Sequence, residues 1–160
     1  MPQVENHFAW CLKDERRLVK VRPNKELAEK HVKKSEYNYN VLLTLERAKQ
    51  YDWALNVGSY AIYHCFLALL AKYGYSSRNQ SCTITALLLL IEQKKLNIDK
   101  DIILQFDTGD VEEGLVNPTV RSERERSTYG VETSIGIEQL KRIKDFILKV
   151  QRETIKVLAE

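Results

Sequence analysis

Glycine, proline and methionine are scarce in this chain. Six glycines, three prolines and one methionine occur among 160 residues. Glycine and proline most often interrupt regular structure, and no alternation of apolar and polar residues stands out between turn residues. The sequence therefore predicts an almost entirely helical chain. No internal repeat, low-complexity tract or linker is visible, so we expect a single domain over residues 1–160.

Cysteine is also rare, with Cys11, Cys65 and Cys82 as the three examples. Their number is odd, they show no close pairing and no C-x-x-C motif occurs, which favours a reducing, cytoplasmic setting. The first ten residues lack a basic stretch followed by an apolar run, so no signal peptide is expected. The spacing of Cys65, Cys82 and His64 fits no recognised ligand set, and we expect neither a metal nor a cofactor.

Strong net charge is absent as well. The chain has 25 basic and 22 acidic side chains, a mild excess that permits nucleic-acid binding without arguing for it. It contains no glycine-rich phosphate loop, no G-x-S-x-G motif and no H-E-x-x-H motif, so the enzyme classes that depend on these motifs gain no support.

Against these absences stands one long uncharged segment, Trp53–Ala71, in a chain that is 29% charged. Its length is close to sufficient for a membrane span. However, polar residues within it, His64 among them, would cost free energy in lipid, and no second comparable segment exists. We therefore expect a buried helix of a soluble protein. Small residues recur on one face of this helix, where another helix can approach closely. These residues are Ala54, Gly58, Ala61, Cys65 and Ala68.

Capping residues and apolar spacing place the helices along the chain. Asn24 is the expected N-cap of the second helix and Ser81 that of the fourth, while Gly74 is expected to end the third. Thr108–Asp110 breaks the pattern, and Asn117-Pro118 is typical of a helix start. The expected helices cover about 5–20, 25–50, 52–73, 82–94, 99–106, 118–129 and 134–158. On the last helix, apolar residues near a 3.5-residue spacing predict a bundle seam. They are Leu140, Ile143, Ile147, Val150, Thr154 and Val157.

Two motifs resemble those of a known family. Residues 59–64, SYAIYH, followed by Leu69-Leu70 and Gly74-Tyr75, resemble the central helix of HEPN domains. Further on, residues 124–130, RERSTYG, resemble the Arg-x-x-Ala-Asp-Tyr signature of one HEPN branch. The order and rough separation of the motifs match, and the resemblance covers roughly residues 25–158. It implies an all-α, up-and-down bundle of five or six helices that forms a single HEPN-like domain.

The resemblance also implies a function. HEPN domains are usually dimeric, and many are toxins, antitoxin partners or proteins associated with nucleotidyltransferases. Catalytic members are metal-independent ribonucleases in which a histidine follows an arginine by four to six residues. None of His7, His31 and His64 follows an arginine at that distance, and Tyr129 stands five residues after Arg124. We therefore expect a non-catalytic module that dimerises and binds a partner protein, a nucleotide or RNA, with no membrane association. The alternative is a divergent metal-independent ribonuclease.

The candidate site residues follow from this resemblance and from their chemistry. Arginine binds phosphate through a bidentate fork, whereas tyrosine is a poor base unless its pKa is strongly perturbed. If the chain is an enzyme, Arg124, Tyr129 and His64 are the expected catalytic residues. The expected ligand-binding residues are Arg121, Arg124, Arg126, Tyr129, Tyr60 and Tyr63.

A simpler interpretation of the same residues remains open. Tyr60, Tyr63 and His64 would then be buried, hydrogen-bonded core groups. Arg121 and Glu125 would be an i,i+4 ion pair on a solvated helix face.

Overall fold

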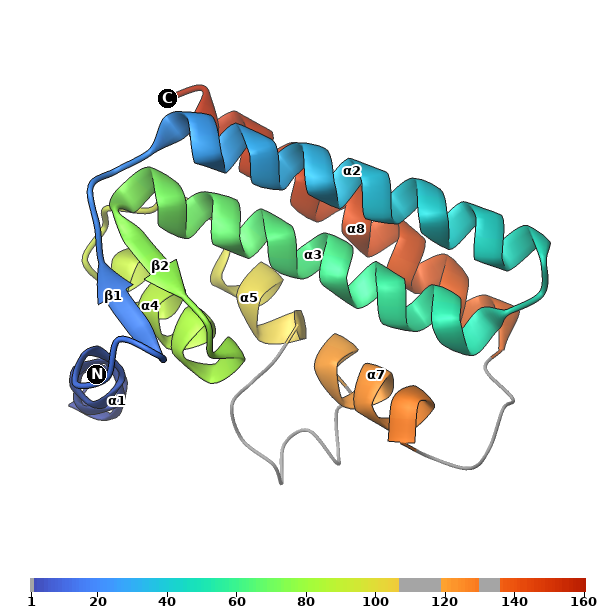
Figure 1. The fold of residues 1–160 in the computed structure, drawn as a ribbon, viewed down its shortest axis with the longest axis horizontal. Helices are drawn as coiled ribbons and strands as arrows, with labels where there is room; N and C mark the ends of the chain where they lie inside the picture. The colour runs from blue at the N-terminus through green and yellow to red at the C-terminus, as the bar shows by residue number, and fades with distance from the viewer. Residues whose placement is uncertain (1, 107–118, 130–135) are drawn as a thin grey trace.

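The computed structural model describes residues 2–106, 119–129 and 136–160. Figure 1 shows three long helices lying side by side, with shorter helices along one edge of α3. The helices are α1 (Pro2–Leu12), α2 (Lys25–Arg47), α3 (Tyr51–Tyr73), α4 (Gln80–Glu92), α5 (Lys100–Phe106), α7 (Val120–Tyr129) and α8 (Ile137–Leu158). The strands are β1 (Leu18–Lys20) and β2 (Tyr75–Ser77). The expected all-α bundle is confirmed, with seven helices in the described ranges rather than five or six.

The long helices α2, α3 and α8 form the main layer of the bundle. The expected small-residue face of α3 is buried in it along its whole length. At its centre, a Cβ added to Gly58 would lie 2.8 Å from Leu42 Cδ1 of α2, 3.1 Å from Ile143 Cγ2 and 3.2 Å from Ile147 Cδ1 of α8. The missing side chain is therefore what lets three helices meet at this point.

The seam expected on the last helix is also confirmed. All six of its residues are buried, and the helix carries its polar residues on the opposite face. Near its start, Lys144 forms an ion pair with Glu46 of α2, with 3.0 Å between Nζ and Oε2. Further along, Gln151 donates a hydrogen bond to Ser35 Oγ of α2 at 2.9 Å. Rising numbers on α8 meet falling numbers on α2, so these two helices are antiparallel.

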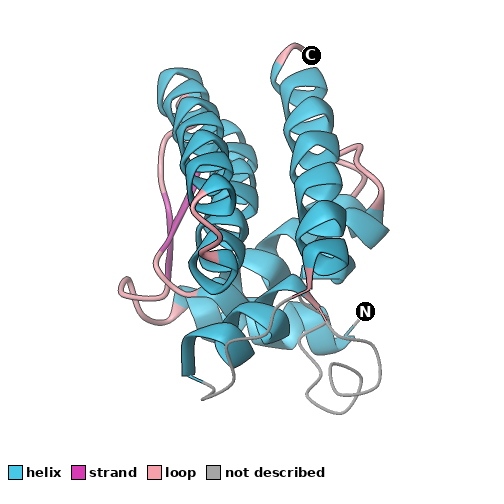
Figure 2. Cartoon of the chain, turned by 90° about the vertical axis from the view of Figure 1, so that its right-hand side faces the viewer, coloured by secondary structure: helices cyan, strands magenta, loops and turns pink. Residues whose placement is uncertain are grey.

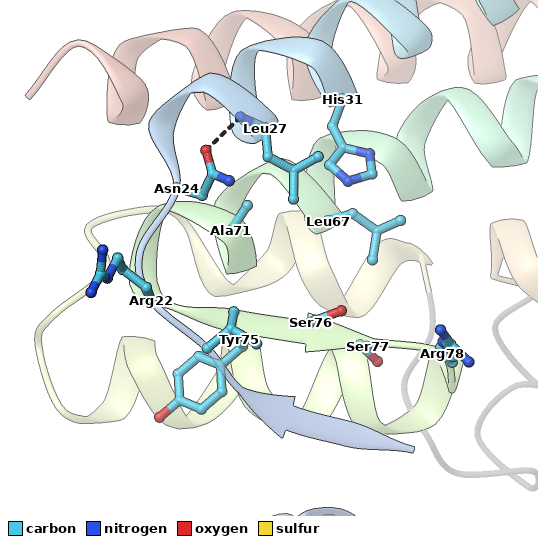
Figure 3. Close-up of a pocket in the computed structure, with 11 residues that line it drawn as sticks. Arg22, Asn24, Leu27, His31, Leu67, Ala71, Tyr75, Ser76, Ser77 and Arg78 are labelled. Carbon is cyan, nitrogen blue, oxygen red and sulfur yellow. Dashed lines mark hydrogen bonds between the residues drawn. The ribbon is translucent and has the colours of Figure 1, made fainter. Parts of the chain in front are cut away.

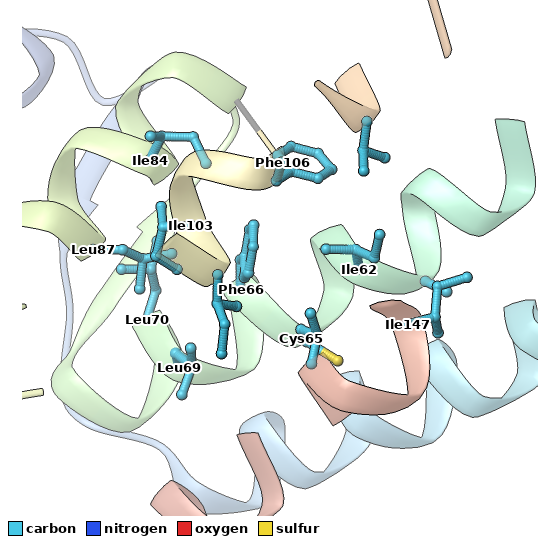
Figure 4. Packing of buried hydrophobic residues seen from close by; sticks show 14 of the residues in the cluster. Ile62, Cys65, Phe66, Leu69, Leu70, Ile84, Leu87, Ile103, Phe106 and Ile147 are labelled. Atoms are coloured by element: carbon cyan, nitrogen blue, oxygen red, sulfur yellow. The ribbon is translucent and has the colours of Figure 1, made fainter. Parts of the chain in front are cut away.

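The second face of α3 is covered by α4 and α7, and α5 reaches it through Phe106. The core on this side centres on Phe66 of α3 and Phe106 of α5, both fully buried, with ring centroids 5.2 Å apart in an edge-to-face arrangement. Figure 4 shows Ile84 and Leu87 of α4 and Ile103 of α5 around these rings. Packing on both faces buries 72% of the apolar stretch of α3. By length and composition this one helix could cross a membrane, but a core helix passes the same test.

The first helix is shorter than expected, and the absence of strands was a wrong prediction. Instead of continuing to Lys20, α1 ends at Leu12. Asp14 then folds the chain into a turn, because its carboxylate accepts hydrogen bonds from the backbone and side chain of Arg16. The chain continues as β1, which pairs antiparallel with β2 and places Val19 opposite Ser76. Figure 2 shows how small this sheet is beside the helices. Three-residue strands are too short for a visible alternation of apolar and polar residues.

Two of the three cysteines form a disulfide, although they lie far apart in the sequence. Cys11 of α1 and Cys82 of α4 form a disulfide across 71 positions of sequence, whereas Cys65 is a free, buried thiol. Burial raises the pKa of Cys65 to about 11, in keeping with its place in the small-residue face of α3. The cytoplasmic location expected from the cysteines stays a prediction.

Two of the three expected boundary residues are confirmed. Asn24 caps α2 by accepting a hydrogen bond from the Leu27 amide at 2.9 Å, and Gly74 ends α3 with a φ of 86°. The predicted cap Ser81 is wrong, because Asn79 accepts from the Cys82 amide at 2.9 Å and α4 begins one residue later. The expected features at Thr108–Asp110 and Asn117-Pro118 lie outside the described residues.

Candidate functional site

Two of the predicted arginines lie where α7 packs along α3. The guanidinium carbon of Arg124 is 5.5 Å from the centroid of the Tyr60 ring, and Arg121 is close enough to Tyr63 to act on its pKa. Arg121 thus lies near Tyr63 and Arg124 near Tyr60, so residue numbers rise along α7 as they fall along α3. The two helices are antiparallel here, and an arginine lies beside a tyrosine at two successive turns. We call Tyr60, Tyr63, Arg121 and Arg124 the arginine–tyrosine site.

The outer part of this site faces solvent. Tyr60 is 41% exposed, and Trp53, seven residues earlier on the same face of α3, is 59% exposed. Arg121 forms the i,i+4 ion pair expected with Glu125, with 3.4 Å between Nε and Oε1. Because both partners are partly exposed, this pair contributes little stability and its guanidinium can exchange partners readily. The site therefore presents positive charge beside exposed aromatic rings.

The inner part of the site belongs to the core. The Tyr63 hydroxyl is 2.9 Å from Thr83 Oγ1 of α4, and its ring stacks on Phe106 with centroids 6.3 Å apart. Burial raises the pKa of Tyr63, although hydrogen bonds to Thr83 and Ser77 oppose the rise. Tyr63 is thus a neutral, hydrogen-bonded tyrosine at neutral pH. It anchors the floor of the site rather than supplying a base.

The histidine that the sequence places on the central helix has its partner on α2. His64 Nδ1 lies 3.0 Å from His31 Nδ1, with the ring centroids 5.2 Å apart. Such a bond needs one ring to donate from Nδ1 and the other to accept there, so the accepting ring is neutral when it forms. Burial lowers the pKa of His31, and burial together with the charges of His31 and Lys34 lowers that of His64 to about 4.

This histidine pair should make the protein sensitive to mild acid. Well above pH 6.5, the ordinary histidine pKa, the rings are neutral in folded and unfolded chains alike. As the pH falls from 6.5 towards 4, the unfolded chain binds protons that the folded one does not, so stability falls. We expect a loss of about 1 kcal/mol between pH 7.5 and pH 5, after allowing for solvent screening of half-buried rings. Urea denaturation at both pH values measures the loss.

Two variants control this measurement. His64→Gln should lower the dependence on pH, because glutamine does not titrate and only the contribution of His31 remains. Lys34→Ala should lower it by less, since it removes one charge near His64 and leaves both rings in place. An unchanged pH dependence in His64→Gln would contradict this account.

A pocket of about 500 Å³ opens beside the histidine pair, between β2 and the start of α2. Figure 3 shows Ser76 and Ser77 of β2 across from His31 and Leu67, with Arg22 and Arg78 at opposite ends. The Ser77 hydroxyl is bonded within the fold, to the backbone oxygens of Arg17 and Asn79. The pocket therefore offers two exposed guanidinium groups but few polar atoms that converge on one point.

The fold brings together four of the predicted site residues, Tyr60, Tyr63, Arg121 and Arg124, whereas His64 lies against α2. Arg126 and Tyr129 belong to α7, but their side chains lie outside the part of the chain that is described. Other residues of possible functional interest were not predicted from the sequence as site residues: Arg22, Arg78, His31, His7, Cys11 and Cys82. Only the spacing of His7 and Cys11, four residues apart on one helix, carried a signal.

No protein-family model matches this chain, and a search of curated proteins gives no match either. The fold defines an antiparallel helical bundle with a small two-stranded sheet. Membership of the HEPN family stays a prediction from the two sequence motifs.

Proposed function

We propose that this chain is a HEPN-type helical module that dimerises and binds RNA through the phosphate groups without cleaving it. Toxin–antitoxin and nucleotidyltransferase-associated systems are the setting in which such a module acts. One observation supports the proposal most: the guanidinium of Arg124 lies over the exposed ring of Tyr60, with Arg121 one turn away. Arginine pairs with phosphate oxygens, and an exposed aromatic ring stacks on an unpaired base.

The local geometry suits a single strand better than a duplex. Trp53 and Tyr60 are exposed rings two helical turns apart, about 10 Å along α3. Bases of a single strand can stack on such rings while the phosphates contact the nearby guanidinium groups. A duplex keeps its bases stacked internally, so it would use only the positive charge.

Binding without cleavage is favoured over the ribonuclease alternative by the state of the titratable groups on α3. Cleavage without a metal needs a base for the 2′-hydroxyl proton and an acid for the leaving oxygen. The ring of His64 is bonded to His31, and Tyr63 is neutral and bonded to Thr83. A guanidinium stays protonated and does not shuttle protons.

The test is binding of a fluorescein-labelled single-stranded RNA, followed by anisotropy in EDTA at two salt concentrations. We expect Arg124→Ala to weaken binding about tenfold and to flatten the salt dependence by about one phosphate contact. Tyr60→Ala should weaken binding at least fivefold through lost stacking. Intact RNA after long incubation is the expected result of a parallel cleavage assay.

The matched control removes two arginines from the other candidate opening. Arg22→Ala with Arg78→Ala deletes the same kind of charge at the pocket in Figure 3 and should change affinity less than threefold. Equal affinity of the wild type and Arg124→Ala would refute the proposed site. RNA cleavage that Arg124→Ala abolishes would establish the ribonuclease instead.

The dimer is implied by the family resemblance, and the fold bears on which surface would form it. The apolar helix α3 is buried within one chain, so it does not offer that surface. A candidate is the stripe of exposed Ile137, Leu148 and Ile155, which share one face of α8. Light scattering on the same samples at micromolar concentration reads the oligomeric state, and a monomer would contradict the dimer.

A further inference from the structure

A cluster of metal-ligating side chains lies where α1 meets α4, away from the arginine–tyrosine site. A ring nitrogen of His7 and the sulfur atoms of Cys11 and Cys82 all lie within 4.8 Å of one another. His7 and Cys11 are one helical turn apart on α1, so their side chains lie on the same face. Both sulfurs are fully buried, whereas His7 is half-buried.

The His7 ring is held in place on two sides. Its Nδ1 lies 2.6 Å from Oγ1 of the buried Thr85, one turn beyond Cys82 on α4. Its face stacks on Trp10 with centroids 5.4 Å apart, and the guanidinium of Arg17 covers that indole at 3.7 Å. When Nδ1 donates its hydrogen to Thr85, Nε2 keeps the lone pair that a metal needs. A hydrogen bond of this kind is the usual support of a metal-binding histidine.

We propose that the reduced chain binds one zinc ion through His7, Cys11 and Cys82, and that the disulfide is the oxidised, metal-free state of the same site. Two thiolates and an imidazole are the donor set that zinc prefers over harder cations. With three protein ligands, the fourth position takes water from the half-buried His7 side. This proposal replaces the expectation, drawn from the sequence, that the chain has no metal site.

The two states interconvert by a balanced exchange. A phosphine reductant gives two electrons to the sulfur–sulfur bond. One water molecule supplies two protons, which complete the two thiols, and its oxygen, which forms the phosphine oxide. Zinc then displaces both thiol protons while the neutral imidazole adds its lone pair. In the other direction, an azo oxidant such as diamide takes two electrons from the thiolates and two protons from solvent. The disulfide forms and Zn²⁺ leaves.

Each state joins α1 to α4, so the site would keep the N-terminal helix attached under both reducing and oxidising conditions. In Figure 1, α1 lies at the edge of the molecule, next to α4 and β1. Without either linkage, α1 would be held only by non-covalent contacts, such as the edge-to-face contact between Phe8 and Tyr75. A reducing compartment, as expected from the sequence, would favour the zinc state.

The experiment uses the full chain, reduced with a phosphine and freed of metal, titrated with Co²⁺ alone and then with Zn²⁺. We expect one Co²⁺ per chain, with thiolate charge-transfer and tetrahedral d–d absorption, displaced by one Zn²⁺. Diamide should release that zinc to a chromogenic chelator, one per chain. His7→Ala should weaken Zn²⁺ binding more than tenfold, and Thr85→Val about tenfold.

Cys65→Ser is the matched control, because it removes the buried thiol that lies outside the cluster, and it should bind as the wild type does. His7→Ala and Thr85→Val retain both sulfurs, so they keep the test valid if replacing Cys11 or Cys82 prevents folding. The proposal is overturned if the reduced wild type binds less than one metal per chain. It is equally overturned if His7→Ala binds normally, or if zinc stays bound after oxidation.

Discussion

Replacing Gly58 by valine should lower the free energy of unfolding by about 3 kcal/mol. The first added carbon would already lie 2.8 Å from Leu42 Cδ1 and within 3.2 Å of Ile147 Cδ1, and valine adds two methyl groups beyond it. Glycine is a poor helix former, so valine would recover a few tenths of a kcal/mol from backbone propensity. The steric cost is several times larger and decides the sign. Thermal unfolding should shift down by about 6–12 °C.

Two further variants separate crowding from the general effect of valine in a helix. Ala9→Val, on the exposed side of α1, should change stability by less than 0.5 kcal/mol. Adding Leu42→Ala to Gly58→Val should cost less than the sum of the two single changes, because the smaller side chain vacates the space that valine needs. Additive costs would argue against the close approach of α2 and α3 at this point.

Replacing Phe106 by alanine should cost about 4 kcal/mol. Phe106 is fully buried, and its ring contacts Phe66 edge-to-face and stacks on Tyr63. Removing it leaves a cavity that the rigid helices around it cannot close. Chemical denaturation measures the loss, and Phe106→Leu, which fills most of the volume, should cost about 1.5 kcal/mol or less.

The same variant tests the coupling between core and site. Tyr63 stacks on Phe106 and lies near Arg121 of α7, so the loss of its stacking partner should loosen the floor of the arginine–tyrosine site. We expect RNA affinity to fall two- to threefold in Phe106→Ala under conditions where the chain stays folded. A stability loss below 2 kcal/mol would mean that this part of the core is not close-packed.

Local chemistry explains which parts of the fold the sequence predicted. The stop of α3 at Gly74 and the cap at Asn24 depend on residues within one turn. Ser81 was a reasonable cap for α4, but Asn79 two residues earlier competes for the same role and makes the bond. The sequence predicts too long a first helix, because an aspartate is also common on a helix surface. Residue type alone therefore does not show that the Asp14 carboxylate stabilises a turn.

The candidate site, like the fold, could be predicted from the sequence only in part. The aromatic residues of α3 and the arginines of α7 could be selected by residue type, since arginine beside tyrosine suits phosphate and base contacts. Their register, Arg124 against Tyr60, depends on how two helices distant in sequence pack. His64 could be selected as well, but its partner His31 lies on another helix, 33 positions away, and no local pattern links them.

By itself the sequence determined that this chain is helical, that α3 is a buried helix with a face of small residues, and that α8 carries a buried apolar seam. Those properties follow from side-chain spacing along a helix, which is local. Only the tertiary structure decided that Cys11 meets Cys82, that His31 meets His64 and that β1 pairs with β2. These contacts join segments 33 to 71 positions apart, and the packing of whole helices selects them.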